Sequence, residues 1–354
     1  MKPCSKPYLT TATAVAALVS VAAGATGAAA DDQTVLRFSN WLPPTHHVVT
    51  EMVTPWAEAV EEATEGRVTV EIVSALGDPP SHYDLVANGV ADLAFGVHGY
   101  TPERFKLTEI GELPFTSNDA VVNSLAYWRT YEEFMMDAGE HDDVVLLGLW
   151  TNGPYQLFTN DTTLTSIDAV DGKRIRVPGA VVEQITQALD MTPISSPLTE
   201  AYEQVARGVI DGMFQQLETV VAFNMTEHMP MGSIAPGGFA HSSQFMVMNR
   251  DSFDSLSEAD QEAIMELSGE AMALRFAEVW QEYEENAIAA LEEEGATLHQ
   301  IDDEVLSELQ DLLAFVTENW VEAAEERDVD GQAALDFYHD QLAAVAEERD
   351  VSAD

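Results

Sequence analysis

Short runs of apolar residues alternate with segments of helical spacing along the first 250 residues of the chain. Strand patterns, in which apolar residues alternate or run together between turn residues, occur at 35–40, 67–74, 92–97, 144–150, 155–159, 174–177, 213–215 and 244–249. Helical spacing is found at 48–64, 82–88 and 120–139. Strands that alternate with helices in this way predict an α/β protein with a largely parallel sheet in each lobe.

The pattern changes to almost entirely helical from Ser257 onward. Ser257 is a good N-cap, and the acidic residues Glu258 and Asp260 suit the first turn of a helix. Apolar spacing then predicts one helix that runs to about Glu294, a length on the order of 55 Å at 1.5 Å per residue. Two further helices are predicted at 303–327 and 331–349.

The first thirty residues have the pattern of a secretory signal peptide. Lys2 and Lys6 precede an apolar stretch, 11–23, that is too short to span a membrane. Ala28-Ala29-Ala30 is a small-residue cleavage site, so we expect cleavage near Ala30 and a periplasmic mature chain. The only cysteine, Cys4, lies before the apolar stretch, so the mature chain is predicted to have no thiol and no disulfide.

Acidic residues dominate the composition, and this excludes several classes of partner. The 15 basic residues, less Lys2 and Lys6, leave 13 against 62 acidic residues, a formal charge of about −49 for the predicted mature chain. Such a chain is a poor partner for nucleic acid or for anionic lipid, both of which need a basic surface. The acids are dispersed, which predicts the hydrated, lysine-poor surface of a halophilic protein.

The stretch DGKRIRVPG, residues 171–179, combines a turn, a short strand and a scarce pair of arginines. Alternation along a strand places Arg174 and Arg176 on one face, and Ile175 and Val177 on the other. An arginine presents a planar fork of donors that suits a carboxylate. The residues alone favour the plainer interpretation, an arginine that pairs with one of the many acids of this chain.

This strand and six further segments resemble the solute-binding proteins of tripartite ATP-independent periplasmic (TRAP) transporters, the DctP-like family. The segments keep the family's order: LRFSNWLPPTHHV (36–48), SALGD (74–78), NGVADLAFG (88–96), ELPF (112–115), EAYEQVARGVIDGMFQ (200–215) and VMNRDSFDSLSEADQ (247–261). The resemblance implies a receptor that binds a small organic acid between two lobes and delivers it to an integral TRAP permease.

The resemblance also implies an architecture. We expect two α/β lobes of the periplasmic-binding-protein type, with one long helix across both and a helical C-terminus. The predicted lobes comprise 31–152 plus 241–280, and 153–240 plus 281–354. We expect a monomer that is not inserted in the membrane, and we expect no cofactor.

The resemblance assigns Arg176 as the clamp for the ligand's carboxylate and Gln215 as a ligand-contacting amide. A second arginine that some members carry is absent, since this chain has Thr159-Asn160-Asp161-Thr162 there. The Glu-Trp pair that accompanies a sodium ion in some oxo-acid receptors is also absent, so no metal is expected. Further candidates for the cleft are Trp41, His98, Tyr100, Trp150, Asn152, Phe214, Glu218 and Arg174.

Two alternatives remain open at this point. The ligand of the same receptor could be a small amine, amino alcohol or polyol held by Glu218 and aromatic faces. A protein of another class, a secreted hydrolase, would need a nucleophile or metal motif, and none is visible. His46-His47 and His141-Asp142-Asp143 lack helical zinc spacing and are interpreted as ordinary loop and turn residues.

Overall fold

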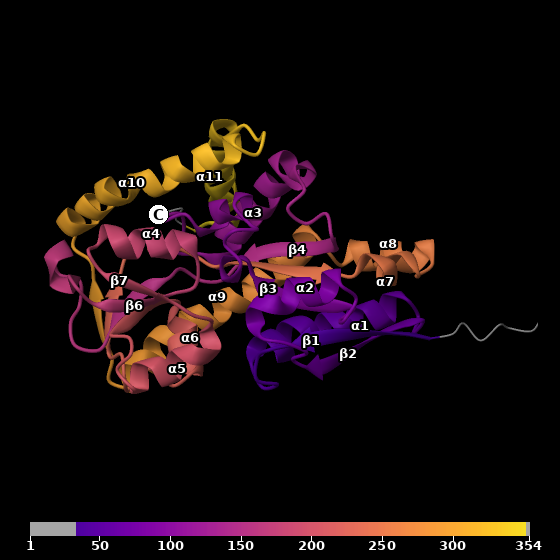
Figure 1. Cartoon of the computed structure of the whole chain (residues 1–354), viewed down its shortest axis with the longest axis horizontal. Helices are drawn as coiled ribbons and strands as arrows, with labels where there is room; N and C mark the ends of the chain where they lie inside the picture. The colour runs from indigo at the N-terminus through magenta and orange to yellow at the C-terminus, as the bar shows by residue number, and fades with distance from the viewer. Residues whose placement is uncertain (1–32, 352–354) are drawn as a thin grey trace, which may run out of the picture. The chain divides into compact units, whose positions relative to one another are not determined.

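The computed structural model describes residues 33–351, so the predicted signal peptide lies outside the described residues. The described chain forms two β-sheets with helices packed around them (Figure 1). None of its helices combines the length and the apolar character that a membrane crossing requires.

The first sheet has five strands in the order β2-β1-β3-β10-β4. Their bounds are β1 (Thr34–Asn40), β2 (Val68–Ser74), β3 (Leu93–Val97), β4 (Val145–Thr151) and β10 (Ser243–Met248). β1 is parallel to both β2 and β3, whereas β10 is antiparallel to β3 and β4. Helices that pack against these strands are α1 (Thr54–Ala63), α2 (His82–Ala87) and α3 (Ala120–Phe134).

The second sheet has six strands in the order β11-β9-β5-β8-β6-β7. Their bounds are β5 (Gln156–Thr159), β6 (Arg174–Val177), β7 (Thr192–Ser195), β8 (Gly212–Gln215), β9 (Met231–Ile234) and β11 (Thr297–Gln300). Only β5 runs antiparallel to its neighbours. The helices of this part are α4 (Ala180–Ala188), α5 (Leu198–Ala206) and α6 (Leu217–Ala222).

The predicted α/β class with largely parallel sheets is confirmed, and each sheet carries one antiparallel strand. β7, β9 and β11 were not predicted from the sequence. Each has only four residues, and β7 contains Pro193. Along β7 and β11, side-chain burial runs exposed, intermediate, intermediate, exposed. This order has no two-residue period, so apolar alternation does not predict these strands.

The predicted helix at 48–64 is two elements. A π-helical segment, η1 (Val48–Val53), leads directly into α1. Pro55 has no N–H for the carbonyl of Glu51, so a regular helical ladder is interrupted at this point. The two residues that precede this irregular start, His46 and His47, are both buried.

The prediction of one helix from Ser257 to Glu294 is wrong. The structure has α8 (Glu258–Glu266) and α9 (Glu270–Glu293) with a break between them, preceded by the short α7 (Arg250–Asp254). Gly269 adopts φ 62°, a conformation that helical residues do not have, and its N–H donates to the Leu147 carbonyl at 2.6 Å. Apolar spacing on both sides of the break hid it from the sequence pattern.

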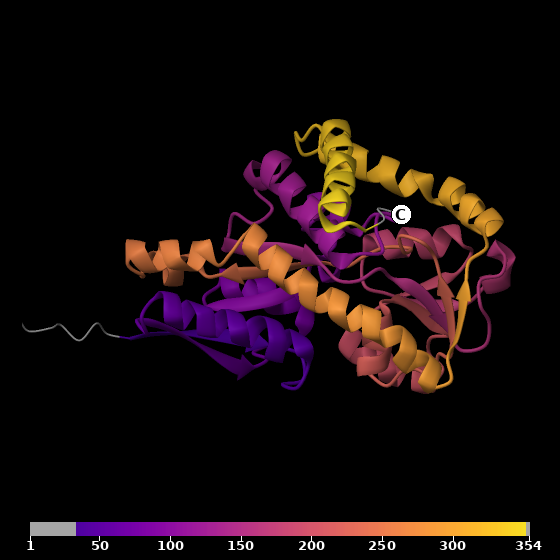
Figure 2. The ribbon, with the colours of Figure 1, turned by 180° about the vertical axis from the view of Figure 1, so that it is seen from behind.

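Helix α9 connects the two parts of the molecule (Figure 2). It contacts α3 and β4, which belong with the first sheet, and α6, which belongs with the second. The C-terminal helices are α10 (Asp303–Glu325) and α11 (Gly331–Arg349). α10 contacts α4, whereas α11 packs along α3, where Arg349 pairs with Asp119 at 3.0 Å. α11 therefore lies against the helices of the first sheet, although we expected the whole of 281–354 to accompany the second lobe.

Candidate functional site

The position of Arg176 follows from the register of β6. This strand lies between β7 and β8 and is parallel to both, with Arg176 opposite Ile194 and Met213. Gly172, at φ 73°, makes the turn that leads into the strand. β6 is next to the edge strand of its sheet, but the Arg176 residue is only 1% exposed.

The guanidinium of Arg176 has only neutral partners among the described residues. Nε donates to the Ser196 carbonyl at 2.9 Å, and Nη1 donates to Oε1 of Gln215 at 3.3 Å. Nη2 is buried and has no hydrogen-bond partner among the described residues. A buried charge without a counter-ion is costly. An anion beside this guanidinium would offset that cost.

Arg176 borders a cavity between the two sheets' layers. The centre of a water molecule can occupy about 30 Å³ of it. Its wall is largely apolar and aromatic, with a few amides and hydroxyls, and among these described residues none is acidic. The lining residues are Trp41, Leu42, His46, Val48, Phe95, Val97, Tyr100, Asn152, Tyr155, Arg176, Leu198, Gln215, Gln216, Thr219, Ser242, Gln244 and Trp280.

An aromatic wall is built on the first sheet. The rings of Trp41 and Phe95 stack with centroids 5.1 Å apart, and Tyr100 meets Trp41 edge-on at 6.2 Å. The Trp41 indole N–H donates to the Phe95 carbonyl at 3.3 Å, which fixes the plane of the ring. This wall presents flat, rigid apolar area to whatever enters the cavity.

Polar groups complete the wall beside the arginine. Oδ1 of Asn152 accepts from the Ser242 backbone N–H at 2.9 Å, so its orientation is fixed. Gln244 is held by the Trp150 indole N–H, which donates to its Oε1 at 2.9 Å. Burial raises the pKa of Tyr155 to about 12, so its phenol keeps its proton at neutral pH and can donate a hydrogen bond.

Two glycines allow the backbones of the two parts to touch at the cavity. A Cβ on Gly179, two residues after β6, would lie 2.7 Å from Cα of Gly99, which follows β3. A Cβ on Gly99 would lie 3.1 Å from the Pro178 carbonyl oxygen. Any side chain at either position would separate these segments. Gly99, beside His98, thus allows a close contact between backbones. The next residue, Tyr100, lines the cavity.

Five of the ten predicted residues line this cavity together: Trp41, Tyr100, Asn152, Arg176 and Gln215. The other five do not. Arg174 is turned to Asp211, which accepts from its Nη2 at 2.7 Å and from its Nε at 2.9 Å. Phe214 is buried against Phe239, with ring centroids 5.1 Å apart.

His98 and Trp150 lie behind the wall rather than in it. His98 is buried and contacts Nε2 of His141 at 3.1 Å and Oγ of Ser243 at 3.2 Å. Trp150 is completely buried and reaches the cavity only through Gln244. A strand end predicts that a side chain is near a cleft, but not which of two neighbours faces it.

Sequence reasoning missed several lining residues, chiefly Phe95, Tyr155, Ser242, Gln244 and Trp280. Phe95 and Gln244 lie within strands that are buried on both faces. Alternation therefore does not show which face lines the cavity. Trp280 lies in the middle of α9 with ordinary core spacing. Tyr155 immediately follows the predicted crossing between lobes. That position is the one feature of the sequence that could have indicated a cavity residue.

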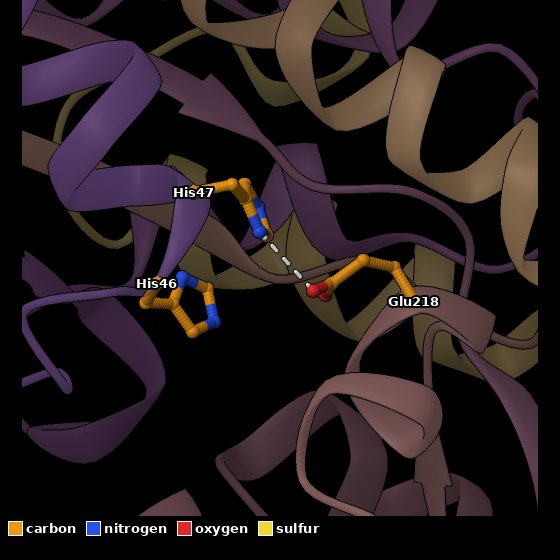
Figure 3. A group of neighbouring side chains, drawn as sticks. All are labelled: His46, His47 and Glu218. Atoms are coloured by element: carbon orange, nitrogen blue, oxygen red, sulfur yellow. Dashed lines mark ion pairs between the residues drawn. The ribbon is translucent and has the colours of Figure 1, made fainter.

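Glu218, the remaining predicted residue, lies in a neighbouring pocket of about 390 Å³. Its Oε1 lies 3.2 Å from Nδ1 of His47, and both side chains are only 3% exposed (Figure 3). His46 borders both this pocket and the Arg176 cavity. Burial, with a smaller contribution from His47, lowers the pKa of His46 to about 4, so this imidazole is neutral at physiological pH.

Two α/β layers that enclose a small cavity, with a bridging helix behind it, define a two-lobed solute-binding protein. The chain belongs to the bacterial extracellular solute-binding proteins of family 7, whose family model matches residues 38–324. The predicted TRAP receptor family and the two-lobed fold are thereby confirmed.

Individual relatives extend over nearly the whole chain. A TRAP periplasmic solute-binding protein from Bordetella bronchiseptica, solved with bound (R)- and (S)-mandelate, is 34% identical, with 88% of this chain and 99% of that one covered and a TM-score of 0.86. A TRAP solute-binding protein from Rhodoferax ferrireducens, in complex with copurified benzoate, is 25% identical, with 90% and 100% covered and a TM-score of 0.84. The protein TsaT of Comamonas testosteroni, named an outer membrane transporter protein, is 30% identical over 87% of this chain and 92% of its own.

These matches decide between the classes left open by the sequence. The family consists of receptors and not of enzymes. The predicted role, a receptor that binds a small organic acid for delivery to a TRAP permease, is confirmed. The family is extracellular, in agreement with the predicted export.

Proposed function

We propose that this receptor binds an aromatic monocarboxylate of the size of benzoate or mandelate, with Arg176 holding the carboxylate. The single observation that carries the proposal is the buried guanidinium, whose Nη2 lacks a partner among the described residues. A carboxylate in the cavity would supply both the missing acceptor and the missing negative charge.

The number of cations in the cavity favours one carboxylate over two. Arg176 is the only arginine or lysine among the described lining residues. A second carboxylate would enter an apolar space without a cation to offset its desolvation. A dicarboxylate or a sugar acid therefore fits this wall less well than a ligand that is charged at one end only.

The lining of the cavity favours a flat apolar body. The closed form leaves only about 30 Å³ for the centre of a water molecule, so a ring would enter only as the lobes part. The rings of Trp41, Phe95 and Tyr100 provide the matching surface. The ligands of the Bordetella and Rhodoferax proteins have this form.

Asn152, Tyr155, Gln215 and Gln244 are proposed to bind the second carboxylate oxygen or a ring substituent. Each contributes a donor or acceptor to the described wall. Nε2 of Gln215 already donates to Oε1 of Gln216 at 2.5 Å, which keeps its Oε1 directed at Arg176. A hydroxylated ring would find partners here that a plain ring would leave unused.

The amine alternative has less support. Glu218, the acid that would accept an ammonium group, contacts His47 in the adjacent pocket and does not line the Arg176 cavity. An ammonium in that cavity would lie near Arg176, with no acid in the described wall. Like charges at short range are destabilising, so the cavity should reject such a ligand.

Ligand entry is proposed to require separation of the two lobes. Arg176 is 1% exposed, so a solute cannot reach it from bulk water in this form. We propose that the first lobe comprises 31–152, 241–280 and α11, which packs against α3, and that the second lobe comprises 153–240 and 281–330. The ligand drives closure because only the closed form lets both walls contact it.

A thermal-shift screen tests the proposal. The purified mature chain is heated with benzoate, 3-hydroxybenzoate, mandelate, succinate, glucuronate or an amino alcohol, each at the same concentration. The aromatic monocarboxylates should give the largest increases in melting temperature. A larger increase with succinate or glucuronate would contradict the proposed ligand class but not the receptor role.

A further inference from the structure

A second polar cluster lies beside the ligand cavity, where His46, His47 and Glu218 come together (Figure 3). One ligand atom from each residue can be chosen so that all three lie within 4.8 Å of one another. The histidines precede η1, and Glu218 is in the first turn of α6. The cluster therefore joins the first sheet's layer to that of the second.

The His47–Glu218 distance fits a tetrahedral metal ion. Nδ1 of His47 and Oε1 of Glu218 are 3.2 Å apart. Two ligands at about 2.0–2.1 Å from a tetrahedral Zn²⁺ are separated by roughly 3.4 Å. An ion could thus lie between these two atoms with almost no movement, whereas the His46 ring, in a group whose ligand atoms spread over up to 4.8 Å, would need to rotate toward them. That rotation would break the 3.2 Å contact from the Val48 N–H to Nδ1 of His46.

The surrounding residues hold the cluster in place. The His47 ring stacks on Tyr283 at 4.2 Å and meets Trp280 edge-on at 4.6 Å. Thr219 donates from Oγ1 to Oε2 of Glu218 at 2.8 Å, which leaves Oε1 for His47. Oriented ligands with fixed neighbours lose little freedom on binding an ion.

The adjoining pocket supplies room for the fourth position. It measures about 390 Å³ and is bordered by all three residues. A site with two imidazoles, one carboxylate and an open position suits Zn²⁺ or a similar borderline cation. Ca²⁺ and Mg²⁺ prefer six or more oxygen ligands and do not match this donor set.

We propose that His46, His47 and Glu218 form a binding site for one divalent transition-metal ion that bridges the two lobes. The ion would bind only where the lobes are together, since its ligands come from both. It would therefore favour the form that encloses Arg176. By linkage, the ion and the carboxylate would each raise the affinity for the other by the same factor.

Calorimetric titration of the mature, chelator-treated protein with ZnCl₂ tests the site without any carboxylate. We expect one ion per chain. Glu218→Gln and His47→Gln should each weaken binding at least about 100-fold, because removal even of outer partners of metal ligands costs 10–100-fold. His339→Gln, at an exposed histidine outside the cluster, is the matched control and should bind as the unchanged protein does.

Substitution with Co²⁺ gives an independent readout that separates a specific site from the acidic surface. A tetrahedral His₂Glu site gives intense visible absorption, whereas carboxylate-bound Co²⁺ is octahedral and pale. Excess Ca²⁺ should not displace the signal. Failure of Zn²⁺ to bind stoichiometrically, equal binding by Glu218→Gln, or a pale Co²⁺ spectrum would each overturn the proposal.

The link to ligand binding rests on the proposed function and is measured separately, with benzoate as the probe. Zn²⁺ should tighten benzoate binding at least about threefold in the unchanged protein and have no effect in Glu218→Gln. Zn²⁺ binding without any benzoate binding would refute the ligand proposal and leave the metal site intact. Benzoate binding without Zn²⁺ binding would refute only the metal site.

Discussion

Two arginines lie two residues apart on β6 in opposite electrostatic situations. Arg174 is 43% exposed at its side chain and forms a two-point pair with Asp211, with N–O distances of 2.7 and 2.9 Å. Arg176 is 1% exposed, and among the described residues its partners are the Ser196 carbonyl and Gln215. The exposed arginine has a carboxylate, and the buried one has none.

The difference originates in one neighbouring strand. β8 is parallel to β6, Asp211 immediately precedes β8, and Gln215 ends it. The N-terminal end of this strand pair thus carries an acid opposite its arginine, and the other end carries an amide. In a chain with 62 acidic and 15 basic residues, the neutral partners of this buried arginine support our proposal that the ligand supplies its counter-ion.

Among the substitutions on β6 and β8, replacing Arg176 should reduce ligand affinity most. In Arg176→Ala, carboxylate affinity should fall by about 2–5 kcal/mol, since a charge-assisted contact in a desolvated cavity is lost. Arg176→Lys should also bind weakly, because an ammonium cannot reproduce the planar fork. Isothermal titration with benzoate measures both, with circular dichroism to verify folding; near-original affinity in Arg176→Ala would remove this residue from the site.

Giving Arg176 an internal counter-ion should mimic the situation of Arg174. Gln215→Glu places a carboxylate where the amide oxygen now lies 3.3 Å from Nη1. The new charge competes with the ligand, so benzoate affinity should decrease on the order of 10–100-fold, less than in Arg176→Ala. The matched control Gln310→Glu, at an exposed position of α10, tests for an unspecific effect of added charge. Unchanged binding by Gln215→Glu would mean that the cavity does not select anions.

How much of this could be read from the sequence differs between the two arginines. The pattern predicted the strand, and the family resemblance led to the prediction, still to be tested, that Arg176 is the clamp. The partner of Arg174 was not predicted, because simple alternation places both arginines on one face. Asp211 lies 37 residues from Arg174 in the chain. Only the register of β6 and β8 brings it there, and no local pattern fixes a register between distant strands.

The same limit explains the other differences. The break at Gly269 depends on a hydrogen bond to Leu147, and the His46–His47–Glu218 cluster depends on the meeting of two layers. Neither contact is local in sequence. The strands β7, β9 and β11 are too short and too irregular for periodicity to detect. Composition and helix patterns, which are local properties, predicted α10 and α11 well.

Glu112 is a buried acid, and unlike the buried Arg176 it can lose its charge. Burial raises the pKa of Glu112 from 4.5 to about 8, and its Oε1 accepts from Ser243 N and Oγ at 3.1 and 2.7 Å. The carboxyl group can take up a proton, whereas an arginine stays charged. Between pH 4.5 and 8 the folded state keeps a proton that the unfolded state loses, so the free energy of unfolding decreases as pH rises.

In Glu112→Gln this contribution should disappear. Between pH 4.5 and 8, the slope of the free energy of unfolding against pH should become less negative by up to about 1.4 kcal/mol per pH unit. The reason is that one proton is no longer linked to unfolding. Urea unfolding at pH 5, 6, 7 and 8 measures the slope, with Glu292→Gln at an exposed position as the control. An identical slope in Glu112→Gln would show that this carboxyl group is ionised in the folded protein.

Removing Arg174 should have the smallest effect. Its pair with Asp211 is solvent-exposed, so Arg174→Ala should lower the free energy of unfolding by only about 0–1 kcal/mol. Benzoate affinity should stay within about twofold, since this side chain does not line the cavity. A large loss of affinity in Arg174→Ala, measured by the same titration, would show that the comparison places the wrong arginine in the site.

The most direct test of the central claim compares benzoate with benzamide on the unchanged protein by isothermal titration. The two molecules share the ring and nearly the same shape, and differ in the charge that Arg176 is proposed to neutralise. Benzoate should bind at least about 100-fold more tightly, in line with roughly 3 kcal/mol for a desolvated charge-assisted pair. Equal affinities for the acid and the amide would contradict the account, because the cavity would then recognise the ring and not the charge.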